Sequence, residues 1–379
     1  MKKNNTVAKS PKREGKRGRS SKGWITIGID LGDKTSRCCA LDEEGEVLFE
    51  RSVATTKKGL AQMFGAMGKC RVALEVGTHS GWVSRLLKSF GHEVIVANAR
   101  QVKLISASSR KDDKLDAQML ARLARIDPEL LRPIRHRSEQ AQLDLLEIRV
   151  RAGLVEARTS LVNTARGLAK ALGERLPKCD TDTMDGERLQ GLPAALQEVL
   201  QPLLNQVESL TEQIHGCNER IEQIARSKYP ETKLLEQVSG VGTLIALTFV
   251  LTVEDAGRFA KSRDMGCYVG LRPRRSASGE SQPQLGISKE GDVYLRKLLV
   301  QGAHGILSRR GPDTDLRRWG LKLAERGGKN AKKRALVAVA RKLAILLHRL
   351  WVTGAEYEPL RHSQARAAAQ KKAAKKKAA

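Results

Sequence analysis

The stretch WITIGIDLG at residues 24–32 predicts a β-strand that ends on an acidic residue. Isoleucines at every second position, from Ile25 to Ile29, alternate with residues that face the opposite way, the last of which is Asp30. A second short apolar run, RVALEV at residues 71–76, again places an acid, Glu75, near its end. If the two strands are neighbours, these carboxylates lie at one edge of a sheet.

The segments around these strands predict a mixed α/β domain. The expected elements are a β-hairpin over residues 37–41 and 46–53, helices over residues 58–67 and 80–90, and a strand over residues 93–97. Three antiparallel strands followed by alternating helices and strands form the pattern of an RNase H-like domain.

Helical periodicity takes over after Ser138. One long helix is predicted because apolar residues recur every three or four positions at Leu143, Leu146, Val150, Leu154, Ala157, Leu161, Ala165, Leu168 and Leu172. A break is expected between Pro177 and Pro202. A coiled-coil seam with strict heptad spacing then follows at Leu203, Val207, Leu210, Ile214, Cys217, Ile221 and Ile224. This second helix could pack against the first within one chain or pair two chains, and the spacing fits both arrangements.

The last section is predicted to be helical. In residues 234–253 the glycines of SGVG at 239–242 separate two apolar stretches, as in a helix-hairpin-helix element. The backbone amides at the second helix could contact a DNA phosphate, or the glycines could form a simple turn. A basic, serine-rich loop follows at residues 270–281, and further helices are predicted from Val293 and over residues 331–351.

The net charge of +27 points to a polyanionic partner. Residues 1–23 contribute +8 and residues 361–379 contribute +7, which leaves +12 on the 337 residues between them. Neutralising phosphates releases counterions, so such a surplus favours nucleic acid, although the tails could simply aid solubility. Aromatic residues make up only 3% of the chain, which favours contacts to the phosphate backbone over base stacking.

Other classes of protein are disfavoured. The most apolar stretch, residues 241–253, is too short to span a bilayer, which takes about 20 residues. No apolar run follows the basic N-terminus, so a signal peptide is not expected. The six cysteines form no CxxC pair and the seven histidines show no HxxxH spacing. These features predict a cytoplasmic protein with reduced thiols, without a zinc site or a membrane partner.

Four carboxylates are the candidates for catalysis. Asp113 and Asp116, in KDDKLDA at residues 111–117, are three positions apart and would share one face of a helix. Together with Asp30 and Glu75 they would repel one another unless they bind a divalent cation, and oxygen ligands suit Mg²⁺ or Mn²⁺. Two such ions can assist phosphoryl transfer. Asp33 and Asp112 are competing candidates, and each acid taken singly could be a cap or a solvated residue.

These motifs resemble the RuvC-like DEDD domain of the insertion-sequence transposases described as bridge-RNA-guided recombinases. The resemblance rests on GIDLG at 28–32, LEVGT at 74–78 and KDDKLDA at 111–117. The C-terminal transposase domain of the same family is matched by SGVGT at 239–243, GLRPR at 270–274, SG at 278–279 and GISKEG at 286–291. The resemblance covers residues 24–355. Where the family usually has Lys-Thr-Asp, this chain has Lys111-Asp112-Asp113, which adds a negative charge.

The resemblance implies a catalytic arrangement. Asp30, Glu75, Asp113 and Asp116 would hold Mg²⁺, and Ser278 would attack DNA to form a covalent phosphoserine intermediate. From the residues alone, Ser276, Ser278 and Ser281 are equally placed, and a loop serine can also serve as a turn residue. Candidate contacts to nucleic acid are Lys111, Gly240, Gly242, Arg272, Arg274, Arg275, Lys289 and Arg296.

The sequence is therefore read as an α/β protein with a large all-α part. We expect a basic disordered tail at 1–23, a RuvC-like catalytic domain at 24–135, long helices at 136–230, a C-terminal transposase domain at 231–355 and a basic tail at 356–379. The resemblance also implies donor and target DNA, a bridge RNA, and dimers that assemble into a tetramer in which one subunit's acids meet another's serine. Alternatives are a junction-resolving endonuclease without a covalent intermediate and a non-enzymatic basic scaffold.

Overall fold

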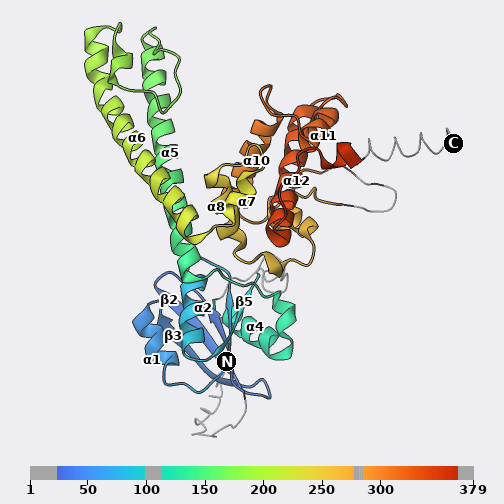
Figure 1. Cartoon of the computed structure of the whole chain (residues 1–379). Coiled ribbons are helices and arrows are strands. Elements are labelled where there is room, and N and C mark those ends of the chain that lie inside the picture. Colours follow the sequence, from blue (N-terminus) through green and yellow to red (C-terminus); the bar gives the residue numbers. More distant parts are fainter. Residues whose placement is uncertain (1–23, 99–112, 277–280, 282, 284, 366–379) are drawn as a thin grey trace, which may run out of the picture. The chain divides into compact units, whose positions relative to one another are not determined.

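The computed structural model describes residues 24–98, 113–276, 281, 283 and 285–365 (Figure 1). The chain divides into two units, one ending at Arg137 and one beginning at Ser138. The first unit is a mixed α/β domain and the second is helical.

The first unit is built on a five-stranded sheet in the order β3-β2-β1-β4-β5. β2 runs antiparallel to β1 and β3, whereas β4 runs parallel to β1 and β5. The strands are β1 (Thr26–Asp30), β2 (Thr35–Leu41), β3 (Val47–Ala54), β4 (Arg71–Glu75) and β5 (Glu93–Ala97). The predicted strands are confirmed, and so is the pattern of three antiparallel strands followed by alternating helices and strands. The sheet is consistent with a RuvC-like fold.

Helices cover both faces of this sheet. The helices of the unit are α1 (Lys57–Phe64), α2 (Ser80–Ser89), α4 (Asp113–Ile126) and the short η1 (Pro128–Leu131). Ile27 and Ile29 of β1 lie in a core with Leu60 and Phe64 of α1 and with Val83 and Leu87 of α2. The opposite face carries smaller residues, such as Ala73 and Cys39, and packs on α4. Strand alternation therefore separates a face that packs on α1 and α2 from a face that packs on α4.

Gly28 of β1 allows α4 to lie directly on the central strand. A Cβ atom at this position would lie 1.9 Å from the carbonyl oxygen of Ala117 and 2.6 Å from the amide nitrogen of Ala121. Both atoms belong to the backbone of α4, so no side-chain rotation could relieve the overlap. Only glycine fits at this crossing.

We expect Gly28→Ala to displace α4 from the sheet. Overpacking a core usually costs about 1–3 kcal/mol of stability. We expect a loss at or above the upper end of this range, because the overlap is with backbone atoms that cannot rotate away. Hydrogen exchange followed by mass spectrometry should show loss of protection in α4. Gly68→Ala is the matched control, because open space surrounds Gly68. Unchanged protection of α4 in Gly28→Ala would contradict the close contact.

Two long helices open the second unit and pack along each other (Figure 1). They are α5 (Glu139–Ala171) and α6 (Ala194–Lys228), with the short helix η2 (Gly186–Leu189) between them. The predicted long helix is confirmed as α5. The heptad seam of α6, from Val207 to Ile221, is buried, and α6 packs on α5 of the same chain. The seam therefore serves an intramolecular helix pair.

The predicted apolar face of α5 is wrong over most of its length. Six of its nine predicted residues are exposed, namely Leu143, Leu146, Val150, Ala157, Leu168 and Leu172. Of the predicted residues only Ala165 is fully buried, and the other buried residues are Ala141, Asp144, Leu145, Ile148, Arg158, Val162 and Ala169. This seam contains an aspartate, an arginine and small alanines, so a search for large apolar side chains selects the neighbouring face.

The predicted break also ends earlier than the sequence indicated. α6 begins at Ala194 and includes Pro202 in its interior. A proline there costs about 3 kcal/mol of helix stability because it removes a hydrogen bond and clashes with the preceding turn. Leu196, Leu200 and Leu204 are buried on both sides of it. Burial of these three leucines offsets the cost of the proline.

Asp144 connects the start of α5 to the end of α6. Its buried carboxylate accepts hydrogen bonds from Lys228 Nζ at 2.9 Å, from Tyr229 Oη at 2.8 Å and from Gln140 Nε2 at 3.1 Å. Burial raises the pKa of Asp144, but the hydrogen bonds from Lys228, Gln140 and Tyr229 outweigh burial and hold the pKa below its usual value. The charged form is therefore the one that stabilises this junction.

Asp144→Asn should destabilise the second unit by about 2–3 kcal/mol at neutral pH, the usual contribution of hydrogen bonds to a charged group. Because the folded pKa of Asp144 is depressed, its contribution is present above the unfolded value of about 4 and is lost as the pH falls through the folded pKa. The measurement is urea unfolding followed by circular dichroism at several pH values.

The control for Asp144 is Glu222→Gln, which removes an exposed ion pair with Arg226 on the surface of α6. It should change the stability by less than about 1 kcal/mol. A difference between Asp144→Asn and the native chain that persists unchanged to acidic pH would contradict the role of the carboxylate.

The remaining helices pack around one apolar core. They are α7 (Thr232–Glu236), α8 (Thr243–Val253), η3 (Ala256–Arg258), η4 (Ser262–Asp264), α9 (Met265–Tyr268), α10 (Val293–Leu307), α11 (Asp315–Ala324) and α12 (Ala331–Thr353). The predicted helices from Val293 and over residues 331–351 are confirmed. α8 supplies Phe249 and Val253 to the core, and α12 supplies Leu343 and Leu347.

An ion pair ties α5 to this helical core. Arg149 of α5 donates a hydrogen bond to Asp292, which also caps α10 by accepting from the Leu295 amide at 2.8 Å. The guanidinium of Arg149 also lies 4.9 Å from the ring centre of Tyr294. The same residues therefore begin α10 and fix it to the long helix.

In the described part of the chain no helix has the length and apolar character needed to cross a membrane. The six cysteines are free, and Cys38, Cys39, Cys70 and Cys217 are buried. Burial raises the pKa of Cys70 to about 11, so this thiol stays protonated at neutral pH. The prediction of buried, unpaired thiols is confirmed for these four residues.

Candidate active site and basic loop

The first unit places two acids side by side at one edge of its sheet. Asp30 is the last residue of β1 and Glu75 is the last residue of β4. The two strands are parallel neighbours, and Ile29 pairs with Leu74 immediately before the acids. Alternation puts Asp30 on the face of Gly28 and Glu75 on the face of Ala73, which is the face that α4 covers.

α4 brings a third acid to this edge. Asp116 directly precedes Ala117, whose carbonyl oxygen lies against Gly28. Burial raises the pKa of Glu75, and the negative charge of Asp116 raises it further. Glu75 and Asp116 are therefore close enough to repel each other. A cation between them would remove this repulsion, and their oxygen atoms are the ligands that Mg²⁺ and Mn²⁺ prefer.

Other predicted members of the acidic site lie at the limit of what the structure describes. Asp113 is the first residue of α4, but the description covers only its backbone, and Lys111 lies outside the described residues. Among the described side chains no three acids, histidines or cysteines form a group that could hold a metal ion. The described part of the site is thus Glu75 with Asp116, beside the strand end that carries Asp30.

Asp33, the candidate that competes with Asp30, lies beside His79. Its carboxylate is 90% exposed and lies 3.5 Å from His79 Nε2. The indole nitrogen of Trp82 donates to His79 Nδ1 at 3.1 Å, so a neutral His79 carries its proton on Nε2 and presents it to Asp33. His79 was not among the predicted site residues. Its i, i+3 spacing from Trp82 at the start of α2 indicates that the two side chains can contact each other.

The serine loop of the second unit is held by a short antiparallel stem. Pro273 bridges Ile287, the Arg274 amide donates to Gly286 O at 2.9 Å, and the Ser288 amide donates to Arg272 O at 2.8 Å. Ser276 and Ser281 are exposed, and Ser278 lies outside the described residues. The structure therefore describes the stem on both sides of the predicted nucleophile.

The predicted phosphate contacts fall into two groups. The side chains of Arg272, Arg274, Arg275 and Lys289 are exposed. Arg296 instead donates to the carbonyl oxygens of Val269 at 3.0 Å and Glu290 at 2.7 Å. It braces the two ends of the serine loop and has this structural role whether or not it meets a phosphate.

The glycine turn between α7 and α8 is observed where it was predicted, but α7 has only five residues. Gly240 has a φ of +83°, and a Cβ atom there would lie 2.6 Å from the carbonyl oxygen of Gly302 in α10. Gly240 is therefore required for packing. Gly242 precedes α8 with open space around it.

Comparisons with known proteins match both units. A transposase family model, for the DEDD domain of IS110 elements, matches residues 27–172, and a model described as "Transposase IS116/IS110/IS902 family" matches residues 232–317. The chain is 30% identical to the transposase for insertion sequence element IS1111A of Coxiella burnetii, over 88% of this chain and 91% of that protein.

Two further relatives are similar over three quarters or more of this chain. A probable family 20 transposase of Pseudomonas aeruginosa is 29% identical over 88% of this chain and 98% of its own length. The transposase for insertion sequence element IS1328 of Yersinia enterocolitica is 27% identical over 75% of this chain and 84% of its own. With a five-stranded α/β unit, acids at its sheet edge and matches that cover both units, this chain belongs to the IS110/IS116 family of insertion-sequence transposases.

Proposed function

We propose that the chain is a DNA recombinase in which four acids and one serine act together. The observation that carries this proposal is the repulsive pair of Glu75 and Asp116, positioned by α4 beside Asp30 in a chain of a transposase family. Asp113 completes the set because it lies three residues before Asp116 on the same helix. Ser278, in the loop whose stem is described, is the proposed nucleophile.

Asp30, Glu75, Asp113 and Asp116 would hold divalent cations, Mg²⁺ or Mn²⁺. When bound, these ions supply Lewis acidity and neutralise negative charge at the reacting phosphate. The acids themselves fix the position of that phosphate relative to the sheet edge. Removing any one of them should therefore abolish cleavage without abolishing DNA binding, which rests on the basic surface.

The proposed chemistry exchanges one phosphodiester bond for another. The Ser278 hydroxyl loses its proton as its oxygen attacks phosphorus, and one bridging P–O bond of the DNA breaks. The leaving oxygen takes up a proton and becomes a free hydroxyl. Because the phosphoserine bond has replaced the DNA bond, a second hydroxyl can reverse the step and join a new strand without an external energy source.

We further propose that a bridge RNA pairs with donor and target DNA, so that base pairing supplies sequence choice while the protein holds backbones. Dimers that assemble into a tetramer would let the acids of one subunit meet the serine of another. In support of subunit contacts, α5 exposes the apolar residues Leu143, Leu146 and Val150. RNA that copurifies with the full-length chain would identify the guide.

Trapping the covalent intermediate tests the nucleophile. Full-length protein is incubated with nicked DNA containing the element's ends and Mg²⁺, denatured in detergent and resolved by electrophoresis. We expect a protein–DNA adduct with the native chain and none with Ser278→Ala. Ser276→Ala and Ser281→Ala are matched controls in the same loop and should retain the adduct.

Each alternative has its own outcome in this assay. Cleavage without any adduct would indicate a junction-resolving endonuclease that activates water. An adduct that survives Ser278→Ala would reject the serine assignment. DNA binding and every activity unchanged in Asp30→Asn and Asp113→Asn would indicate a non-enzymatic scaffold.

Glu75→Gln should raise the melting temperature of the chain in a buffer with a chelator, because it removes a carboxylate whose pKa is raised by burial and by repulsion from Asp116. The same variant should lose most of the stabilisation that Mg²⁺ gives to the native chain. Differential scanning fluorimetry with and without Mg²⁺ measures both effects. The control is Glu44→Gln, which changes an exposed acid in the turn after β2 and should behave like the native chain. Equal stabilisation of the two variants by Mg²⁺ would contradict a metal site at Glu75.

A further inference from the structure

A groove of about 1110 Å³ lies between the serine loop and α12. One wall is formed by the loop stem, including Arg274, Arg275 and Ser276, and the other by one face of α12. The volume slightly exceeds the range of roughly 300–1,000 Å³ that is usual for small-molecule sites. The groove is therefore large enough for a segment of a polymer.

The groove is lined by seven cationic side chains, and its described lining contains no acid. They are Arg263, Arg274, Arg275, Lys333, Arg334, Arg341 and Lys342. Within the described residues none of the seven forms an ion pair with a carboxylate, although many other arginines of the chain do. The lining also contains apolar residues, including Leu271 beside the loop and Val337 and Ile345 of α12. Such a surface suits a chain of phosphates.

Two of these cations have defined contacts within the protein, and one of them, Arg341, is half-buried. Arg341 fits against α9 because Gly266 has no side chain, and its buried Nε atom has no hydrogen-bond partner. Lys342 Nζ lies 3.9 Å from the ring centre of Trp319, and burial lowers the pKa of Lys342. Cations held in fixed positions without an anion are costly, so an anionic ligand would stabilise them.

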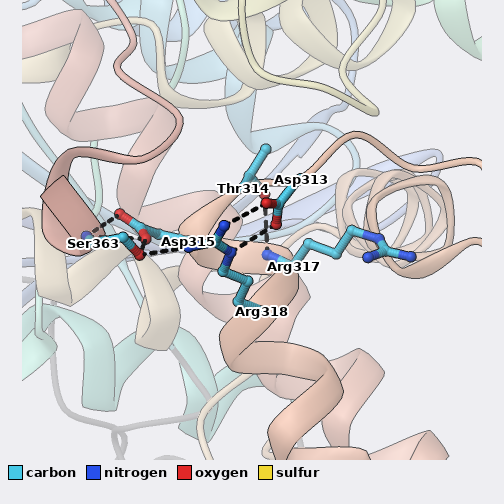
Figure 2. Close-up of polar contacts among 6 residues, drawn as sticks. All are labelled: Asp313, Thr314, Asp315, Arg317, Arg318 and Ser363. Carbon is cyan, nitrogen blue, oxygen red and sulfur yellow. Dashed lines mark hydrogen bonds and ion pairs between the residues drawn. The ribbon is translucent and has the colours of Figure 1, made fainter.

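Trp319 lines the groove from a third element, α11, whose start is fixed by a polar network. Figure 2 shows Asp315 with Ser363, and Arg318 with Asp313. The Asp315 carboxylate also accepts from the His362 amide at 2.6 Å, and Thr314 caps α11 by accepting from the Arg317 amide at 3.1 Å. Trp319 follows one turn after Asp315, so the groove is built on an anchored helix.

The spacing of cations on α12 matches a short stretch of a nucleic-acid strand. Lys333 and Arg334 precede Arg341 and Lys342 by eight residues, which is about 12 Å along a helix that rises 1.5 Å per residue. A DNA strand carries one phosphate per roughly 3.4 Å of helix axis. Measured along the axis of a duplex, the two pairs span about three to four nucleotides of one strand.

We propose that this groove binds the phosphate backbone of the DNA strand that the serine loop acts on, over about three to four nucleotides. The inference rests on the proposed function, because it names the surface that holds that substrate. DNA is the occupant argued for because the loop forming one wall carries Ser276 in the lining and Ser278 two residues further along the sequence.

Charge-matched variants of α12 test the groove. Lys333→Gln/Arg334→Gln removes two groove cations, whereas Lys332→Gln/Arg349→Gln removes two exposed cations of the same helix that lie outside the groove. DNA affinity is measured by fluorescence anisotropy with a labelled duplex at several salt concentrations. For the groove variant we expect about tenfold weaker binding and a salt slope smaller by about one to two units. The control should stay close to the native chain.

Two results would overturn the proposal that this groove binds DNA. Equal losses in both variants would show that only the overall charge matters. Weaker binding of an RNA strand of the same sequence, with unchanged DNA binding, would assign the groove to RNA.

The adduct assay separates this inference from the proposed function. If the groove is correct, Lys333→Gln/Arg334→Gln lowers adduct formation at limiting DNA and recovers it at saturating DNA. Ser278→Ala should bind DNA with the native salt slope and form no adduct. An adduct in Ser278→Ala together with a binding loss in the groove variant would reject the nucleophile and keep the groove. Native DNA binding in the groove variant with no adduct in Ser278→Ala would reject the groove and keep the nucleophile.

Discussion

The contact between Gly28 and the backbone of α4 is the constraint on which the acidic site depends. A side chain at Gly28 would overlap the backbone at Ala117 and Ala121, so the helix can reach the central strand only because glycine is present. This contact sets the height of Asp116 above the sheet edge, where Glu75 already ends β4. This arrangement is electrostatically unfavourable, because burial and the negative charge of Asp116 raise the pKa of Glu75. A cation placed between the two carboxylates would remove this repulsion.

The second unit uses polar groups inside its helix pair. Asp144 and Arg158 occupy positions of α5 where leucine would be expected, and both are buried. Asp144 has three hydrogen-bond partners, and Arg158 donates to Thr211 of α6 at 3.1 Å. Polar pairs at such positions favour one register, because sliding either helix would leave a buried charge unpaired. The helix pair and the ion pair of Arg149 with Asp292 thus hold α5 in a defined place relative to the C-terminal helices.

The basic character of the protein acquires a location in the structure. A net charge of +27 indicates nucleic acid without saying where it binds. The fold collects cations that are far apart in the sequence, such as Arg263, Arg274 and Arg341, around one groove beside the serine loop. The structure also shows which arginines make hydrogen bonds within the protein and which are exposed. Arg296 donates to a backbone carbonyl, whereas the side chain of Arg274 is exposed.

The sequence by itself determined the strands, the long helices and the acids at the strand ends. Alternation and heptad spacing are set by residues close together in the chain, so they can be recognised without knowing the tertiary contacts. Asp30 and Glu75 could be selected from their places at the ends of β1 and β4. Only the tertiary structure decided which face of α5 is buried, that α6 continues through Pro202, and that Gly240 serves packing against Gly302. The proximity of Asp116 to Glu75 was predicted from the motifs and agrees with the charge interaction between them, whereas only the tertiary structure gathered the groove. These outcomes depend on contacts between residues distant in sequence, whose burial energies outweigh local preference and leave no periodic trace.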